Sequence, residues 1–272
     1  CFCAQIRAAA DEGRTSREPQ FAVPVREWQE VQVLPWKGRD LTTKTGLSRS
    51  PTVLTILAAV GFPISLYLIF VATPLDAELG FTQKIFYFHV PCAWITYLAF
   101  FVGSGSGVAY LLRRSRRWDH LAHASIEVGT VFTTLVLVTG PLWARPAWGA
   151  YWVWDARLTT TFVLWLIEIA YLLLREFVEE PEKAARFCAV LGLLGALDVP
   201  VIHFSVVLWR GLHPEAVVLS PRGFASGLPA DFLVALVVSL ATFTVLFGVM
   251  LSLRYRVLRA TEQIDYLRRG AG

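Results

Sequence analysis

The 272-residue sequence is poor in charged residues and in cysteine, and both shortages limit what the chain can be. Charged residues make up 17% of the chain and hydrophobic residues 55%, which is too apolar for an ordinary soluble domain of this size. The four cysteines form no paired framework. Cys92 and Cys188 lie inside apolar runs, where we expect small buried hydrophobic residues. Cys1 and Cys3 have only the spacing of a metal or redox pair.

The sequence also lacks the residue groupings of a catalyst. It shows no combination of a nucleophile with an acid and a base, so we do not expect an enzyme. The net charge of +4 is modest, and we expect no nucleic-acid partner. We expect no secretory signal peptide before the first apolar run.

Long apolar runs are what the chain has in abundance. Six of them approach or exceed the roughly 20 residues that a helix needs to cross a bilayer. They cover residues 52–73, 86–112, 121–143, 158–174, 188–209 and 231–253. The sequence therefore predicts an all-α integral membrane protein with six transmembrane helices (51–255). A polar, disordered N-terminal tail (1–50) and a basic cytoplasmic C-terminal tail (256–272) are expected to flank them.

The loops between these runs differ in their basic residues. RRSRRWDH (113–120), REFVEEPEKAAR (175–186) and RYRVLRATEQIDYLRR (254–269) carry most of the Arg and Lys, and the connections on the opposite side carry fewer. Short cytoplasmic loops are enriched in these residues. We therefore expect both termini in the cytoplasm and the connection between the third and fourth helices outside.

This topology sorts the five histidines by depth. His120 and His123 fall at the cytoplasmic start of the third helix, and His203 lies within the fifth. His89, in KIFYFHVP, and His213, in WRGLHPEA, share an outer depth. Two imidazoles facing each other across an aromatic pocket suit haem, whose iron takes axial histidines. Taken singly, a membrane histidine is more often a packed, hydrogen-bonded residue.

The outer connection WGAYWVWDARLT (148–159) is rich in aromatic residues. Such residues often form an interfacial belt, but a belt would spread over many helix ends, whereas these crowd one loop: Trp148, Tyr151, Trp152 and Trp154. Arg157 follows closely and could bind a haem propionate with both arms of its guanidinium group. Arg145 is a second candidate for that role. Asp155 and Arg157 could instead form a local pair that caps the fourth helix.

WGAYWVWDARLT resembles the signature of the tryptophan-rich haem-handling membrane proteins of cytochrome c maturation. Its DARLT ending is similar to the CcmC (haem exporter protein C) branch, whereas the CcmF and CcsA branches typically continue as WDP. FHVPCAW (88–94), GPLWARPAWG (140–149) and PVIHFSVVLWRGLHP (200–214) resemble further segments of the family. The resemblance covers about residues 50–255 and includes the six-helix count.

The resemblance implies a site for non-covalent, transient haem b. It places the axial iron ligands at His89 and His213, and gives His203 a structural role. The family's tryptophan motif maps onto Trp148, Gly149, Trp152, Trp154 and Asp155. Tyr151 stands where members often have Trp, which keeps an aromatic face at that position.

The resemblance also implies a function. Such a protein would bind haem at the outer (periplasmic) face of the inner membrane, in contact with lipid. It would deliver haem to the haem chaperone CcmE, beside the ATP-binding-cassette subunits CcmA and CcmB and the small subunit CcmD. Three alternatives stay open: a CcsA-type haem-attachment synthase, a proton-coupled transporter that uses Glu127 and Asp198, and a structural subunit that its aromatic residues anchor.

Overall fold

The computed structural model describes residues 49–209, 211–214 and 228–270, all of which belong to one compact unit that runs from Leu47 to Gly272. The predicted N-terminal tail lies outside the described residues except for its last two, which begin the first helix. Cys1 and Cys3 also lie outside them.

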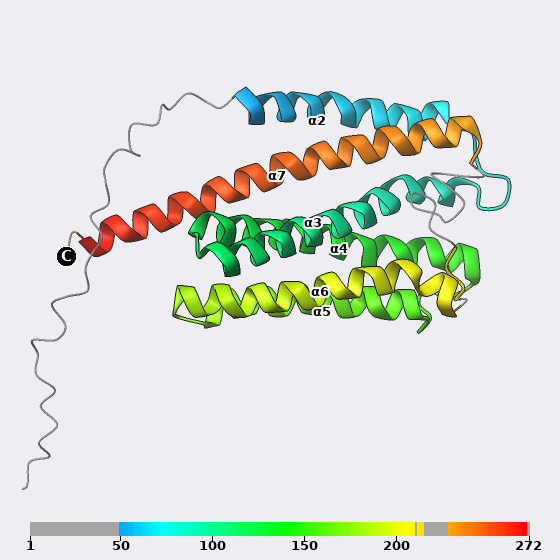
Figure 1. Cartoon of the computed structure of the whole chain (residues 1–272). Helices are drawn as coiled ribbons and strands as arrows, with labels where there is room; N and C mark the ends of the chain where they lie inside the picture. Colours follow the sequence, from blue (N-terminus) through cyan, green and yellow to red (C-terminus); the bar gives the residue numbers. More distant parts are fainter. Residues whose placement is uncertain (1–48, 210, 215–227, 271–272) are drawn as a thin grey trace, which may run out of the picture. The chain divides into compact units, whose positions relative to one another are not determined.

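Six long helices make up the described chain (Figure 1). They are α2 (Arg49–Tyr67, extended by the π-helical turn Leu68–Ala72), α3 (Phe86–Arg113, preceded by the 3-10 turn Phe81–Ile85), α4 (Arg116–Trp148), α5 (Ala156–Phe177), α6 (Pro181–Trp209) and α7 (Ala230–Gly270). Each is long and apolar enough to cross a membrane. The described residues contain an isolated β-bridge but no strand. The prediction of an all-α membrane protein with six spans is confirmed.

Several helix ends follow from local sequence. Gly149 closes α4 with a φ of +79°, a conformation that costs glycine little, and its N–H donates to the carbonyl of Arg145. Asp155 caps α5 with a side chain that accepts from the N–H of Leu158 at 2.8 Å. The last helix continues past the predicted span end at residue 253, because no proline or glycine interrupts residues 249–269.

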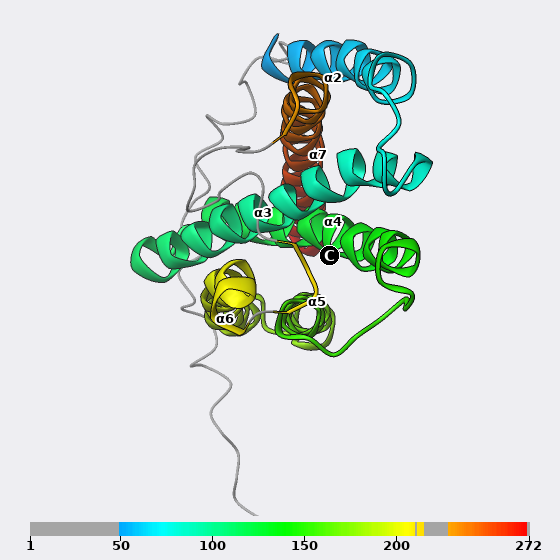
Figure 2. The ribbon, with the colours of Figure 1, turned by 90° about the vertical axis from the view of Figure 1, so that its right-hand side faces the viewer.

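The helices form adjacent pairs, with α2 beside α7 and α5 beside α6, while α3 and α4 lie between the pairs (Figures 1 and 2). One core cluster joins α3, α4 and α7 and includes Cys92, Phe132 and Phe243. Another joins the four helices α3, α4, α5 and α6, and it includes Phe100, Leu164 and Cys188. Both cysteines are buried, as predicted.

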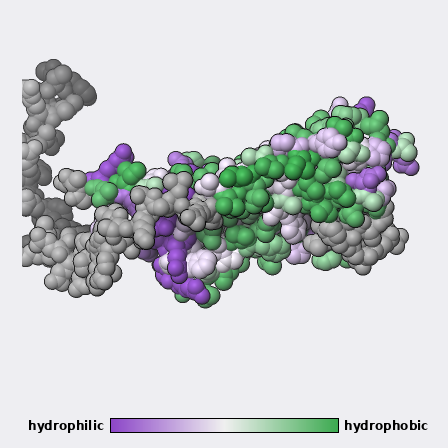
Figure 3. Space-filling view, turned by 90° about the horizontal axis from the view of Figure 1, so that it is seen from above, coloured by the Kyte–Doolittle hydropathy of each residue, from purple (hydrophilic) through white to green (hydrophobic). Residues whose placement is uncertain are grey.

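The surface of the bundle is apolar along the middle of the helices. In the face that Figure 3 shows, a hydrophobic band separates more hydrophilic regions at the two ends. Large apolar side chains such as Leu57, Phe101 and Leu197 are exposed. Such a surface suits lipid rather than water, which agrees with a multi-pass membrane protein.

Candidate functional site

A cavity lies at the end of the bundle where α3 and α5 begin and α4 and α6 end. Its walls come from these four helices, from Trp152 in the α4–α5 connection, and from His213 and Pro214 after α6. It contains about 1270 Å³ of space, part of which is open to the surroundings. Most lining residues are aliphatic or aromatic, and a few polar groups converge among them, as is typical of ligand sites.

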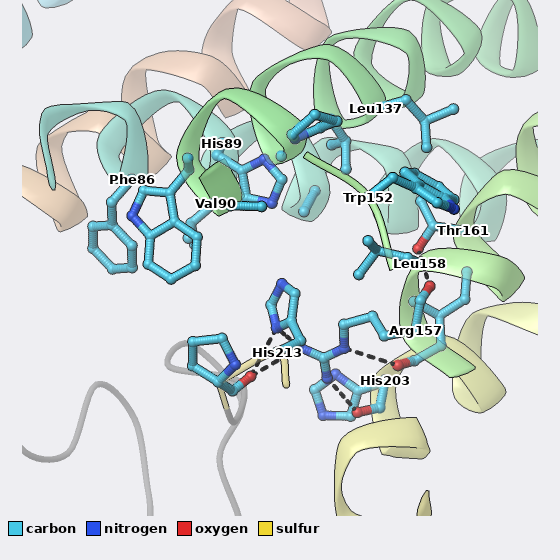
Figure 4. Close-up of a pocket in the computed structure, with 18 of the residues that line it drawn as sticks. Phe86, His89, Val90, Leu137, Trp152, Arg157, Leu158, Thr161, His203 and His213 are labelled. Carbon is cyan, nitrogen blue, oxygen red and sulfur yellow. Dashed lines mark hydrogen bonds between the residues drawn. The ribbon is translucent and has the colours of Figure 1, made fainter. Parts of the chain in front are cut away.

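Five of the nine predicted site residues line this cavity: His89, Trp148, Trp152, Arg157 and His213. Figure 4 shows His89 and His213 reaching into it from opposite sides. The other four predicted residues, Gly149, Tyr151, Trp154 and Asp155, are not part of the lining. The structure thus brings together two histidines that are more than 100 positions apart in the sequence.

The side chain of His89 is held by Thr139 of α4. The Nδ1 atom of His89 lies 2.8 Å from the Thr139 hydroxyl, which donates its own proton to the carbonyl of Leu135 at 2.6 Å. The hydroxyl can therefore only accept from His89, which places the imidazole proton on Nδ1. The lone pair of Nε2 is left free, as metal binding requires. Gly140 permits this packing, since a methyl group there would lie 3.3 Å from the ring.

His213 is held by two neighbours at Nδ1. This atom lies 2.9 Å from the carbonyl oxygen of Pro214, which can only accept, and 3.1 Å from Nη1 of Arg157, which can only donate. The tautomer with the proton on Nδ1 bonds to Pro214 and frees Nε2. Burial and the charge of Arg157 lower the pKa of His213 to about 4, against the opposing effect of the Pro214 carbonyl. His213 is therefore neutral at pH 7, the state that can bind a metal.

Arg157 joins α5 to the end of α6. Its guanidinium group donates to the carbonyls of Ile202 at 3.3 Å, His203 at 2.8 Å and Pro214 at 3.3 Å. Figure 4 shows these bonds around the base of His213. Asp155 caps α5, as one sequence alternative proposed, but Arg157 does not complete the predicted pair with it. It contacts α6 instead and holds the segment that carries His213.

The tryptophans around the cavity do not form a flat shelf. Trp143 and Trp148 meet edge to face, with ring centres 5.4 Å apart, and Trp148 meets His213 in the same way at 6.1 Å. Edge-to-face contacts are the preferred geometry of aromatic pairs. The indole N–H groups of Trp143 and Trp152 are buried and have no hydrogen-bond partner within the described part of the chain. Both residues line the cavity, so its wall contains two unsatisfied N–H donors.

The remaining predicted residues support the connection from outside the cavity. The guanidinium group of Arg145 donates to the carbonyl of Gly149 and lies 5.6 Å from the ring centre of Tyr151, so it stiffens the loop. Tyr151 and Trp154 are exposed. Trp154 packs edge to face on Trp152, at 5.5 Å. These residues position the cavity wall rather than form it.

Some residues of interest were not singled out from the sequence. Thr139 and Trp143 act on the cavity, but no local pattern links Thr139 to a histidine 50 positions earlier. Glu168, fully buried in α5, accepts from Thr133 at 2.9 Å. The two acids that the sequence did indicate, Glu127 and Asp198, differ from each other in their partners. Glu127 accepts from Arg254 at 2.6 Å, and Asp198 has a buried oxygen without a partner among the described residues.

The donor set suits a particular kind of ligand. Among the described residues, no group of three or more His, Cys, Asp or Glu side chains could hold a bare metal ion. Haem iron brings four ring nitrogens of its own and needs only axial ligands. The two opposed imidazoles suit the haem iron. The aromatic walls suit the macrocycle, and the unsatisfied N–H donors suit its carboxylates.

Comparisons with known proteins point to the same ligand. Residues 42–268 match the family model described as "CcmC: Heme exporter protein C". A "Heme exporter protein C" from Rhodobacter capsulatus is 31% identical over 90% of this chain and 96% of its own length. The protein of that name from Escherichia coli K12 is 34% identical over 71% and 73%. The one from Bradyrhizobium diazoefficiens is 42% identical over 64% of this chain, and the match spans 65% of that relative, slightly less than two thirds.

Proposed function

The chain belongs to the heme exporter protein C family, and on that premise we propose that it holds haem in this cavity and hands it to a haem chaperone. Family membership supports a role in haem handling for cytochrome c biogenesis.

One observation carries the proposal. Two histidines from distant parts of the chain enter one tryptophan-lined cavity, and a proton on Nδ1, bonded to Thr139 in His89 and to the Pro214 carbonyl in His213, leaves Nε2 free in each. In this proposal His89 and His213 are the axial ligands of a haem b that is bound without a covalent link. The buried N–H groups of Trp143 and Trp152 are then available to the propionates.

Haem is the cargo in this proposal, so its site must also release it. His89 lies within α3, a helix of 28 residues, whereas His213 lies on the segment that follows α6. A ligand on a connecting segment can withdraw with less disruption than one inside a packed helix. We therefore expect His213 to leave the iron first, replaced by a ligand of the chaperone.

The orientation follows from charge. The connections α3–α4 and α5–α6 and the end of α7 carry clusters of Arg and Lys, which favours the cytoplasm for that end. The cavity then faces the periplasm at the inner membrane. The partners proposed with this placement are the chaperone CcmE, the transporter subunits CcmA and CcmB, and the small subunit CcmD.

The alternatives have less support. A proton-coupled transporter would use free acids within the membrane. Glu127 is paired with Arg254, so this alternative depends on Asp198, whose buried oxygen has no partner among the described residues. A haem-attachment synthase of the CcsA type would be expected to continue its tryptophan motif as WDP, whereas this chain reads WDA. We propose handling of haem rather than catalysis.

A transfer experiment tests the proposal. The haem-loaded protein in lipid nanodiscs is mixed with apo-chaperone, and the appearance of haem on the re-isolated chaperone is followed by its absorption. We expect transfer from the wild type and faster initial transfer from His213→Ala than from His89→Ala. A wild type that binds haem but retains it would contradict delivery. Trapping of haem by His213→Ala would contradict the release order.

A further inference from the structure

A second hollow lies beside the cavity, on the outer surface of the bundle between α4 and α5. We call it the α4–α5 groove. Its lining comes from both helices and from their connection: Thr134, Leu137, Val138, Trp152, Trp154, Phe162 and Trp165. Two of these residues, Leu137 and Trp152, also line the cavity, and Figure 4 shows both at its edge. The groove and the cavity are therefore neighbours that share a wall.

The groove opens onto the apolar surface of the bundle. Its α4 and α5 residues lie within two membrane spans. Val138 in the groove is 54% exposed, and nearby Leu135, Val163 and Leu166 are exposed as well. The surroundings of the groove are thus suited to lipid chains.

A row of aromatic rings runs along the groove to the cavity. Trp165 and Phe162 are stacked, with ring centres 6.0 Å apart and planes 18° from parallel. Phe162 lies 6.3 Å from Trp152, which forms part of the cavity wall. The row connects the lipid-facing surface with the proposed haem site without a break.

An interfacial belt does not account for this row. Trp165 lies nine residues beyond the first residue of α5, which is about 13 Å along the helix axis. Belts stay at the membrane boundary, whereas this depth approaches the bilayer midplane, about 15 Å below the edge of the hydrocarbon. The Trp165 N–H donates to Thr134 at 2.9 Å, so the ring is satisfied and fixed at that depth.

We propose that the α4–α5 groove is a lateral entrance through which haem passes from the outer leaflet of the lipid into the cavity. This inference rests on the proposed function. Haem is flat and largely apolar, so it can lie in lipid and slide along aromatic faces. Trp152 belongs to both walls, and a change of its side-chain rotamer joins the two spaces. An acyl chain has no planar faces to match the stacked pair.

The test compares two sources of haem at equal concentration. Phosphatidylcholine vesicles that contain haem supply it through lipid, and a water-soluble carrier protein supplies it through water. The acceptor is the full chain in nanodiscs, and stopped-flow absorption follows the bound form. Phe162→Ala shortens the aromatic row, and Val138→Trp fills the groove. Phe101→Ala is the control, because it removes a lipid-facing ring that is 57% exposed on α3.

We expect Phe162→Ala to slow loading from vesicles by about three- to tenfold, the effect of one lost aromatic contact. Val138→Trp should slow it at least as much, because the added ring blocks the groove. In both groove variants, the rate of loading from the carrier and the final spectrum should equal those of the wild type. Phe101→Ala should load at the wild-type rate from both sources. Wild-type rates in both groove variants would overturn the entrance, as would equal slowing from both sources. A wild type that binds no haem from either source would instead contradict the proposed function.

Discussion

The two ends of the bundle each hold a pair of histidines, but in opposite settings. At the cavity end, Nδ1 of His89 contacts the Thr139 hydroxyl, and Nδ1 of His213 contacts the Pro214 carbonyl and Arg157. At the opposite end, which we call the charged end, Nε2 of His120 lies 3.1 Å from Glu262 and Nε2 of His123 lies 3.6 Å from Glu127. The same side chain thus faces a cavity at one end and contacts a carboxylate at the other.

The charged end also carries a network of ion pairs. Buried Asp119 accepts from Arg175 of α5 and from Arg116, which in turn donates to Glu262 of α7. This network ties α4, α5 and α7 together. Buried N–H donors without a partner among the described residues occur at both ends, on Trp143 and Trp152 beside the cavity and on Trp118 and Arg175 at the charged end. The comparison indicates that ion pairs hold the helices together at the charged end, whereas the cavity end places two histidines beside a space lined mostly by apolar residues.

The largest expected effect is a loss of stability when the ion-pair network of the charged end is broken. Asp119→Ala leaves Arg175 without its buried partner, and we expect a loss of about 3–5 kcal/mol in the free energy of unfolding. Thermal unfolding in detergent measures it. The haem spectrum of the protein that remains folded should not change. Glu180→Ala is the control, because its pair with Lys183 is exposed and contributes less than about 1 kcal/mol. Equal losses of unfolding free energy in both variants would contradict a special structural role for the buried Asp119–Arg175 pair.

The next effect concerns the unsatisfied donors at the cavity. Trp143→Phe and Trp152→Phe keep a ring and remove the N–H, and we expect each to weaken haem binding about 10- to 100-fold, the value of a charge-assisted hydrogen bond. Trp94→Phe is the matched control. Trp94 lines the same cavity, but its N–H already donates to Thr244 at 3.2 Å. Equal weakening in all three, measured by haem titration, would mean that only ring packing matters.

A smaller effect concerns the orientation of His89. Thr139→Val keeps the bulk of the side chain and removes the hydroxyl that fixes the imidazole tautomer. We expect haem affinity to fall by about two- to tenfold, the value of one neutral hydrogen bond, and part of the iron to become high-spin. Thr139→Ser restores the bond and should restore the spectrum. Identical spectra from the Val and Ser variants would contradict a positioning role for Thr139.

The smallest effect is expected from moderate acid. The pKa of His213 lies near 4, below the 6.5 of a free imidazole, so the residue stays neutral between pH 8 and about pH 5.5. Its contribution to the folded state is complete above pH 6.5 and is lost as the pH falls toward 4. The haem spectrum should therefore be constant from pH 8 to 5.5. A transition centred near pH 6.5 would show that His213 is exposed.

Much of this architecture could be predicted because it depends on local composition. The six spans follow from apolar runs, and the shared depth of His89 and His213 follows from the positions of those runs. The extension of α7 to Gly270 was missed, because a charged helix that pairs with α4 has no apolar signature.

The details of the site depend on packing between distant segments. Arg157 could be expected near Asp155, but its bonds to α6 carbonyls depend on how α5 and α6 meet. Trp148 and Trp152 line the cavity while Tyr151 and Trp154 do not, which the letters WGAYWVWD do not reveal. Thr139 meets His89 only because α3 and α4 are packed together.

The absorption spectrum of the detergent-purified protein is the decisive test of haem ligation by His89 and His213. It is recorded for the wild type with His89→Ala and His213→Ala, and with His120→Ala and His123→Ala from the charged end. The account predicts a low-spin spectrum with two histidine ligands that is lost or turns high-spin in the first two variants and persists in the last two. A wild type without haem after haem is added, or a spectrum that depends on His120 or His123 instead, would contradict it.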